Sequence, residues 1–284
     1  MSTRRIAKIF KSQPTVEGAG VHLKRAFGYA QVPLLDPFLM LDDFHTSIPG
    51  EYLAGFPWHP HRGIETITYI FEGLVEHGDS MGNTGVISAG DVQWMTAGSG
   101  IIHQEMPKES PTGTMWGLQF WANLPADQKM MHPRYRDVKA ADIPEITLEG
   151  GVLAKIIAGT VDGVQGPVKD IVIEPEMLDI YIPADSVFRH TIQKGHTAFI
   201  YILSGEGRFD ESGDICQNET LLLFERSGDA VKIETDGTPA RFMLVSGKPL
   251  GEPVAWGGPI VMNTQEELQT AFDEFNTGTF IKRD

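Results

Sequence analysis

Strand-like runs of five to nine residues recur along this chain, and glycine, proline, asparagine or aspartate separates most of them. Short apolar runs with turn-forming residues between them are typical of an all-β protein. Their spacing fits a sandwich or a barrel, in which short strands return repeatedly across one core. The predicted strands are 67–71, 84–89, 91–95, 116–124, 152–160, 177–183, 198–203, 220–225, 230–235 and 240–247.

One stretch, residues 264–275, has a helical pattern of apolar positions instead. Leu268 and Phe272 recur there at helical spacing. Thr264 can cap the first turn, and Glu267, three residues later, completes the pattern of a capping box. The sequence therefore predicts a C-terminal helix that docks through its apolar stripe.

The two halves of the chain have similar strand patterns. The segment "ITYIFEG" ends at Gly73, and the similar segment "FIYILSG" ends at Gly205, 132 residues later. Between them, residues 125–150 are polar and rich in turn-forming residues, which indicates a connection. We therefore expect two β domains, residues 1–135 and residues 136–284, with the helix in the second.

The repeat does not extend to the histidines of the first half. The same offset places His59 on Thr191 and His61 on Gln193, whereas His190 falls one residue out of register. A shift of one residue turns a strand side chain to the opposite face. The second domain is therefore expected to repeat the scaffold without the histidine pair.

Composition and charge exclude several classes of function. Of the 284 residues, 41% are hydrophobic, which is enough for a buried core. The 38 acidic residues outnumber the 23 basic ones and give a formal net charge of −15. Such a surface repels phosphate backbones and anionic lipid, so direct binding of nucleic acid is not expected. No apolar stretch approaches the roughly 20 residues that cross a bilayer, so no membrane partner is expected.

Cysteine content and the first residues predict a cytoplasmic protein. Cys216 is the single cysteine, so it cannot form an internal disulfide, which fits a reducing compartment. The opening "MSTRRIAKIF" is basic but lacks the apolar core and cleavage site of a secretory signal. With one cysteine, a metal site is expected to use nitrogen and oxygen ligands.

The first candidate metal-site residues lie in "FPWHPHRGIE", residues 56–65. His59, His61 and Glu65 are all odd-numbered, so an extended chain would place them on one face. An isolated pair of histidines at this spacing is weak support for a metal site and is more often structural. Glu65 has three interpretations: a metal ligand, a hydrogen-bond partner behind a histidine, or a charge at the start of a strand.

A second pair strengthens the metal hypothesis. In "TAGSGIIHQEMP", residues 96–107, His103 and Glu105 again alternate. Alternate residues of barrel strands converge on the interior, so two strands can bring three imidazoles and one carboxylate together. The other histidines, including His77, show no comparable pairing, and we interpret them as surface or structural residues.

Three nitrogens and one oxygen are a donor set that divalent transition metals accept. Fe(II), Mn, Co, Ni, Cu and Zn are all compatible with it. Four protein ligands would close a tetrahedral site, whereas a six-coordinate ion would keep two positions for water or substrate. Open positions on a redox metal are what O2 chemistry needs. A purely structural metal is a weaker alternative, because a chain of this length can bury a core without one.

The chain resembles the pirins, a family with two cupin barrels in one polypeptide. The similarity runs from about residue 17 to about residue 275. The resemblance implies a bicupin, two jelly-roll-like β-barrels with a C-terminal helix, and one metal in the N-terminal barrel. The segments that carry it are "LDPFLMLDDF" (35–44), "FPWHPHRGIETITYIFEG" (56–73), "GDVQWMTAGSGIIHQEMP" (90–107), "GLQFWANLP" (117–125) and "GPIVMNTQEEL" (258–268).

The resemblance also implies a ligand set. Carried over residue by residue, the pirin ligands are His59, His61, His103 and Glu105. Ordinary cupins use a glutamate at the position of Glu65 as a metal ligand. In pirins the later glutamate is the ligand instead, so the resemblance implies that Glu65 contacts the ligands and not the metal. The expected ion is Fe(II), with Mn, Co, Ni, Cu and Zn as alternatives.

Family members show quercetinase activity, in which O2 is inserted into a flavonol ring that opens and releases carbon monoxide. The resemblance therefore implies a small aromatic substrate and O2, with Glu105 as a base toward the flavonol hydroxyl. The apolar side chains of Phe56, Trp94 and Met106 are expected to line a pocket for a flat ligand.

A regulator is the alternative. Pirins in animals act as iron-dependent transcription coregulators, and some bacterial pirins modulate metabolic enzymes. Under this alternative the metal senses redox state, and the protein acts by binding a protein partner through its surface. A eukaryotic protein of this kind would be nuclear as well as cytoplasmic. Turnover separates the two hypotheses, because an enzyme consumes O2 with a flavonol whereas a sensor only cycles its metal.

Overall fold

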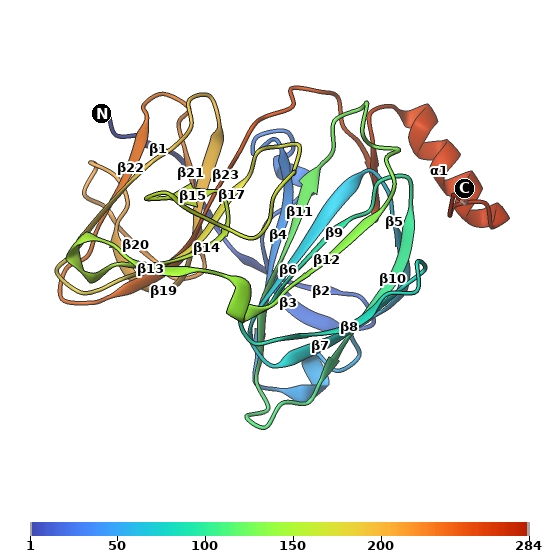
Figure 1. Cartoon of the computed structure of the whole chain (residues 1–284), viewed down its shortest axis with the longest axis horizontal. Coiled ribbons are helices and arrows are strands. Elements are labelled where there is room, and N and C mark those ends of the chain that lie inside the picture. Colours follow the sequence, from blue (N-terminus) through green and yellow to red (C-terminus); the bar gives the residue numbers. More distant parts are fainter. Residues whose placement is uncertain (1, 283–284) are drawn as a thin grey trace. The chain divides into compact units, whose positions relative to one another are not determined.

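The computed structural model describes residues 2–282 and confirms the all-β prediction, with one α-helix near the C-terminus (Figure 1). The chain divides into two compact units. Residues 13–34, 38–140 and 250–282 form what we call the N-terminal barrel. The segment ending at Ser12, together with residues 35–37 and 141–249, forms the C-terminal barrel.

Two antiparallel sheets build the N-terminal barrel. The larger has the spatial order β12 (Arg134–Val138), β9 (Val92–Thr96), β6 (Ile64–Glu72), β11 (Met115–Asn123), β4 (Phe38–Thr46), β3 (Val21–Phe27) and β2 (Gln13–Glu17). The smaller has the order β5 (Phe56–His61), β10 (Ile101–Lys108), β7 (Leu74–Asp79) and β8 (Thr84–Ser88). Two 3-10 turns, Tyr29–Gln31 and Pro49–Glu51, lie in connections between strands of this barrel.

One ten-stranded sheet curves through the C-terminal barrel. Its main path is β1 (Ile6–Lys11), β21 (Thr220–Phe224), β19 (Thr197–Arg208), β23 (Ala240–Gly247), β17 (Glu176–Ile182), β14 (Leu153–Ala158) and β13 (Glu145–Thr147). The strands β18 (Val187–Thr191), β20 (Ile215–Gln217) and β22 (Ala230–Glu234) complete it. A small hairpin, β15 (Thr160–Val161) and β16 (Val164–Gln165), and the 3-10 turns Ala140–Asp142 and Glu149–Gly151 fill the remaining connections.

Alternation along the strands fills the C-terminal barrel with apolar side chains. On β17, Leu178, Ile180 and Ile182 are fully buried and belong to one cluster with Phe242 and Leu244 of β23. Successive side chains of a strand point to opposite faces, so this even-numbered set points inward. Aliphatic and aromatic residues therefore occupy the interior of this barrel.

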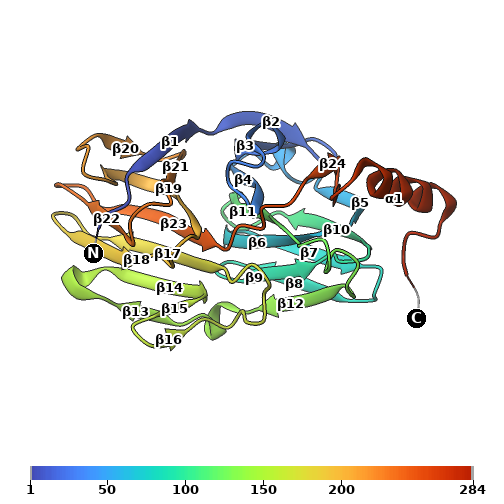
Figure 2. The ribbon, with the colours of Figure 1, turned by 90° about the horizontal axis from the view of Figure 1, so that it is seen from above.

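The internal repeat predicted from the sequence is confirmed by strand order. In the N-terminal barrel β6 lies between β9 and β11, and in the C-terminal barrel β19 lies between β21 and β23. Tyr69 of β6 and Tyr201 of β19, which the 132-residue offset aligns, are both buried. Figure 2 shows β21, β19, β23, β17 and β14 following one another across the C-terminal barrel.

The C-terminal helix forms as predicted but groups with the other barrel. It spans Gln265–Thr277 (α1), and Thr264 and Glu267 form the expected capping box. We expected it within a domain of residues 136–284, yet residues 250–282 group with the N-terminal barrel. The reason is apolar packing: Leu268 joins a cluster that includes Ile102 of β10.

Short strands connect this helix to the N-terminal barrel. They are β24 (Ala255–Gly257) and β25 (Ile260–Met262), which form a two-stranded antiparallel hairpin. Ile260 and Met262 pack against the helix. Within residues 2–282, none of the helices has the length and apolar character that crossing a bilayer requires.

Candidate metal centre

Two neighbouring strands of the smaller sheet position the histidines. β5 is the edge strand, and its pairing with β10 sets His59 directly opposite His103 and His61 opposite Ile101. Directly opposed residues of an antiparallel pair project from the same face. Pro60, between the two β5 histidines, is compatible with an edge strand because it lacks an N–H to donate.

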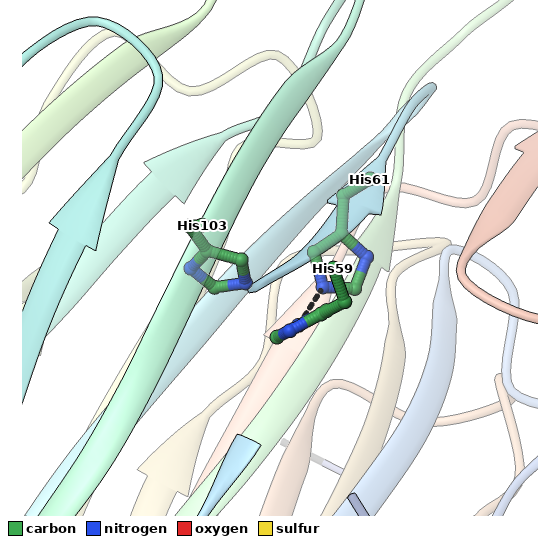
Figure 3. A group of neighbouring side chains, drawn as sticks. All are labelled: His59, His61 and His103. Atoms are coloured by element: carbon green, nitrogen blue, oxygen red, sulfur yellow. Dashed lines mark hydrogen bonds between the residues drawn. The ribbon is translucent and has the colours of Figure 1, made fainter. Parts of the chain in front are cut away.

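The three imidazole rings lie next to one another (Figure 3). Ring centroids are 4.4 Å apart for His59 and His103, 4.9 Å for His59 and His61, and 5.0 Å for His61 and His103. One ring nitrogen from each residue lies within 4.8 Å of those of the other two. The sequence prediction that these histidines converge is thus confirmed in geometry.

Backbone carbonyls fix the tautomers of two of the rings. Nδ1 of His59 lies 2.8 Å from the carbonyl oxygen of Pro57, and Nδ1 of His61 lies 3.0 Å from that of Pro259. A carbonyl oxygen only accepts, so each Nδ1 carries the hydrogen and each Nε2 keeps a lone pair. These two Nε2 atoms nevertheless face each other at 3.1 Å.

His103 is fully buried, and neither of its ring nitrogens has a hydrogen-bond partner among residues 2–282. Burial lowers the pKa of His103 well below its ordinary value, and the nearby histidines lower it further. Burial and, to a smaller degree, His59 lower the pKa of His61 to about 3, although the carbonyl of Pro259 acts in the opposite direction. Neutral imidazoles with free lone pairs are the form that binds a metal.

These residues fit a divalent transition metal. The Nε2 atoms of His59 and His61 lie 3.1 Å apart, close enough for both to bind one ion, since metal–imidazole bonds are about 2.1 Å long. A cation near both would remove the repulsion between their lone pairs and give the buried His103 a partner, which it lacks among residues 2–282. Imidazole suits iron, nickel, copper and zinc alike, so the donor set does not select one ion.

Glu105 lies on the same face of β10 as His103, as the alternation predicted, but its carboxylate has another partner. Both side chains are buried, and β10 is irregular between them where it pairs with β5. Oε1 of Glu105 lies 2.9 Å from the hydroxyl oxygen of Thr68 on β6. Among the described residues, the three histidines alone make up the group whose ligand atoms lie within 4.8 Å of one another.

Thr68 links Glu105 to a second polar side chain. Its hydroxyl oxygen is also 2.8 Å from Oε1 of Gln119 on β11. A hydroxyl has one hydrogen to donate, so Thr68 donates to Glu105 and the Gln119 amide presents its nitrogen to Thr68. Thr68 thereby holds one oxygen of the Glu105 carboxyl in place.

Glu65 does not continue the line of the histidine pair. Strand β5 ends at His61, and the chain turns at Gly63, where φ is +76°. Glu65 belongs to β6 in the other sheet. The Thr96 hydroxyl donates to Oε1 of Glu65 at 2.7 Å. Burial raises the pKa of Glu65 above its ordinary value, although this hydrogen bond opposes the shift. The extended-chain interpretation of residues 59–65 was therefore wrong.

A cavity of about 770 Å³ opens at the histidines. His59, His61 and Glu105 line it. Phe56 lines it as expected, whereas Trp94 is buried on β9 and Met106 belongs to β10, and neither lies along its wall.

The walls of this cavity differ in chemistry. One is aromatic: the ring of Trp121 lies 5.1 Å from His61 and 5.7 Å from Trp256, whose ring is 5.6 Å from Tyr29. The rest includes a charged group, in which Arg25 donates two hydrogen bonds, of 2.8 and 2.7 Å, to the Asp42 carboxylate. Such a cavity can hold a flat ring that carries polar substituents.

His77 was missed in the sequence. It is buried on β7, with its ring 5.4 Å from that of His103 and stacked on Tyr135 at 4.8 Å. Nε2 of His77 lies 3.3 Å from Oδ2 of Asp79. Burial alone would raise the pKa of Asp79, but hydrogen bonds from His77 and Asn83 lower it below its ordinary value. The signal was available, because His77 and Asp79 alternate as His59 and His61 do.

Comparisons with known proteins cover nearly the whole chain. A family model described as Pirin matches residues 20–122, and one described as Pirin C-terminal cupin domain matches residues 177–281. A pirin-like protein of Caulobacter vibrioides is 43% identical over 282 residues, which is 99% of this chain and 100% of that protein. Human pirin is 39% identical over 281 residues, 96% of this chain and 93% of its own length.

A solved structure agrees with the fold. The crystal structure of quercetin 2,3-dioxygenase from Acinetobacter baumannii is similar to this chain with a TM-score of 0.90 and 30% sequence identity. The match covers 98% of this chain and 99% of that one.

Proposed function

This chain belongs to the pirin family, and from that premise we propose that it is a metal-dependent dioxygenase that cleaves a flavonol or a related aromatic compound with O2. The observation that carries the proposal is the histidine geometry. The Nε2 lone pairs of His59 and His61 face each other at 3.1 Å, and both residues line a cavity large enough for a small aromatic molecule. Beside them lies buried His103, whose ring nitrogens have no hydrogen-bond partner within residues 2–282. The likeness to a quercetin 2,3-dioxygenase structure supports the same reaction class.

His59, His61 and His103 would hold one divalent ion, with Glu105 as the proposed fourth ligand. Fe(II) is the ion that we propose first, with Mn, Co, Ni, Cu and Zn as alternatives. When bound, a redox metal supplies the one-electron chemistry through which O2 reacts with an organic molecule.

The cavity would bind and orient the substrate. A flat ring can stack against Trp121 and Trp256, which continue from His61 toward Tyr29. Hydroxyl groups at the far end of such a ring would meet the polar group of Arg25 and Asp42. Holding the substrate in one orientation at the histidines removes part of the entropic barrier to reaction.

Glu105 is the proposed acceptor of the substrate proton. Its carboxyl lines the cavity, and Thr68 holds one of its oxygens at 2.9 Å. A carboxylate oxygen of Glu105 can accept the hydrogen of the flavonol hydroxyl, which leaves an electron-rich flavonolate for oxidation. A positioned general base contributes typically about 10²- to 10⁴-fold to a rate.

Anaerobic reconstitution with Fe(II) followed by exposure to O2 and quercetin tests the proposal. We expect one O2 consumed and one carbon monoxide released for each quercetin lost, and no turnover by the His61→Ala variant. Metal bound in the wild type without any O2 consumption would overturn the dioxygenase assignment. That result would favour the alternative, a metal-dependent regulator that acts through a protein partner, and co-purification of such a partner would be the next test.

A further inference from the structure

The ring of His61 is held by a residue far away in the sequence. Its Nδ1 donates to the carbonyl oxygen of Pro259 at 3.0 Å, across 198 residues. Pro259 lies between β24 and β25 in the hairpin of the C-terminal segment. Metal-binding histidines characteristically donate their second ring nitrogen to a carbonyl or carboxylate, which fixes both tautomer and orientation. Here the group that does so comes from outside the cupin strands.

The hairpin lies directly against the turn that follows His61. The Val261 N–H donates to the carbonyl oxygen of Arg62 at 3.1 Å, and Ile260 forms an isolated parallel bridge with Arg62. Gly63 leaves room for this approach, since a β-carbon there would overlap the carbonyl oxygen of Val261. The turn that follows His61 and the β24–β25 hairpin are therefore in backbone contact.

A buried lysine ties the hairpin down. Nζ of Lys129 donates to the carbonyl oxygens of Gly63 and Val261, at 2.9 and 3.1 Å, and to Oδ1 of Asn123 at 2.6 Å. Three acceptors match the three donors of an ammonium group. Lys129 is 1% exposed, so each lost acceptor would leave a buried donor unsatisfied.

A buried arginine ties down the segment that follows. Arg62 donates through Nε to the carbonyl oxygen of Ser99 at 2.7 Å and through a terminal nitrogen to that of Phe280 at 2.9 Å. The same nitrogen is 2.8 Å from a carboxylate oxygen of Glu274 on α1. The guanidinium also lies 4.2 Å from the centroid of the Phe280 ring, within cation–π range.

The same hairpin contributes to the cavity. Trp256 lines it beside Gly258 and Pro259, and the indole Nε1 donates to the carbonyl oxygen of Gly258 at 2.7 Å. This bond orients the indole, whose ring is 5.7 Å from Trp121. The orientation of His61 and the shape of the aromatic wall thus depend on one short element.

We propose that the β24–β25 hairpin is a working part of the metal centre: Pro259 and its anchors Lys129 and Arg62 position His61, and Trp256 is a specificity-determining residue for flat aromatic ligands. The inference rests on the metal-binding part of the proposed function but not on turnover. It assigns a functional role to a segment that contains none of the ligands.

Metal affinity tests the positioning role. Lys129→Met removes the anchor and keeps an apolar stem, and Co(II) is the probe, titrated against a chromophoric chelator and followed by its visible spectrum. We expect the dissociation constant to rise about 10- to 100-fold, the usual effect of losing support behind a ligand, with an altered Co(II) spectrum. Lys108→Met is the control, because Lys108 is 48% exposed on β10 of the same barrel.

A second variant covers the case in which Lys129→Met fails to fold. Glu274→Gln keeps the size of a partly exposed side chain but removes the charge that meets Arg62, and it is expected to weaken Co(II) binding in the same direction. Glu266→Gln, exposed in the first turn of the same helix, is its control. Wild-type affinity and an unchanged spectrum in folded Lys129→Met or Glu274→Gln protein would overturn the positioning role.

Ligand binding tests Trp256 separately. Quercetin affinity, measured without O2 on Co(II)-loaded protein, should fall about tenfold in Trp256→Ala, as expected for a lost aromatic face and its buried area. Trp58→Ala is the matched control, since Trp58 is 55% exposed on β5 and does not line the cavity. Equal quercetin affinity in Trp256→Ala and wild type would overturn the specificity role.

These experiments separate the inference from the proposed function. Wild-type protein that takes up no Co(II) would overturn metal binding itself and this inference with it. Wild-type protein that binds Co(II) but never turns over quercetin would overturn the dioxygenase alone. The positioning role would then stand or fall on the Lys129 and Glu274 variants.

Discussion

Nε2 of His59 faces Nε2 of His61 at 3.1 Å, although the carbonyls of Pro57 and Pro259 leave neither atom with a hydrogen. Two lone pairs at this separation repel each other. Burial lowers the pKa of His61 to about 3, so His61 does not take up a proton near neutral pH that would remove this repulsion. A bound cation would resolve the contact.

Replacing His61 by alanine should abolish metal retention and leave the protein soluble. The cross-strand pairing of His61 with Ile101 is made by the backbone, which alanine preserves on an edge strand. Iron content after anaerobic loading and desalting measures the effect. His22→Ala, at a histidine that is 56% exposed, should retain wild-type metal. Stoichiometric iron in His61→Ala would disprove the ligand assignment.

Glu105→Gln should reduce kcat by about 10²- to 10⁴-fold, because a carboxamide cannot accept the substrate proton. The amide oxygen can still accept from Thr68, so the local geometry should survive. Steady-state O2 uptake with quercetin measures the loss. Unchanged kcat in this variant would exclude Glu105 as the base.

Lys129 should make stability rise with pH above neutrality. Burial lowers the pKa of Lys129 to about 7 from its ordinary 10.5, so between these values the unfolded chain binds more protons than the folded one. The free energy of unfolding therefore gains from Lys129 as pH rises from about 7 to 10.5, and this gain is absent below that window. Denaturant unfolding of wild type and Lys129→Met at several pH values measures it. A constant difference between the two proteins would contradict the prediction.

Gly63→Ala should be much more destabilising than Gly82→Ala. Both glycines have positive φ, +76° and +89°, so alanine carries a backbone cost of about 1–2 kcal/mol at either position. Only at Gly63 does the added β-carbon also overlap a backbone atom, the carbonyl oxygen of Val261, whereas Gly82 has open space. Thermal unfolding midpoints compare them. Equal losses would show that the hairpin can move away from this turn.

Patterns with a short range predicted much of this molecule. The alternation of His103 and Glu105 on one strand, and the capping of α1 by Thr264 and Glu267, depend only on residues two or three positions apart. The internal repeat also held, because equal strand patterns fold into equal strand orders. His77 was within reach of the same reasoning, since it alternates with Asp79.

Predictions failed where the chain turns or where distant segments meet. Glu65 was placed on the face of the histidine pair because the chain was taken as extended, but the positive φ of Gly63 starts a new strand in another sheet. The C-terminal helix was predicted within the second domain, but it packs against the N-terminal barrel, because a stripe containing Leu268 indicates that a partner exists but not which surface it covers.

By itself, the sequence determined the all-β character, the internal repeat and a candidate metal-binding set of side chains, because periodicity of two along a strand is a local property of the backbone. Tertiary structure alone decided that Pro259 closes on Nδ1 of His61 and that Trp256 joins the cavity. Those contacts join positions nearly two hundred residues apart through buried Lys129 and Arg62, and no local pattern encodes which distant segment will satisfy a buried cation.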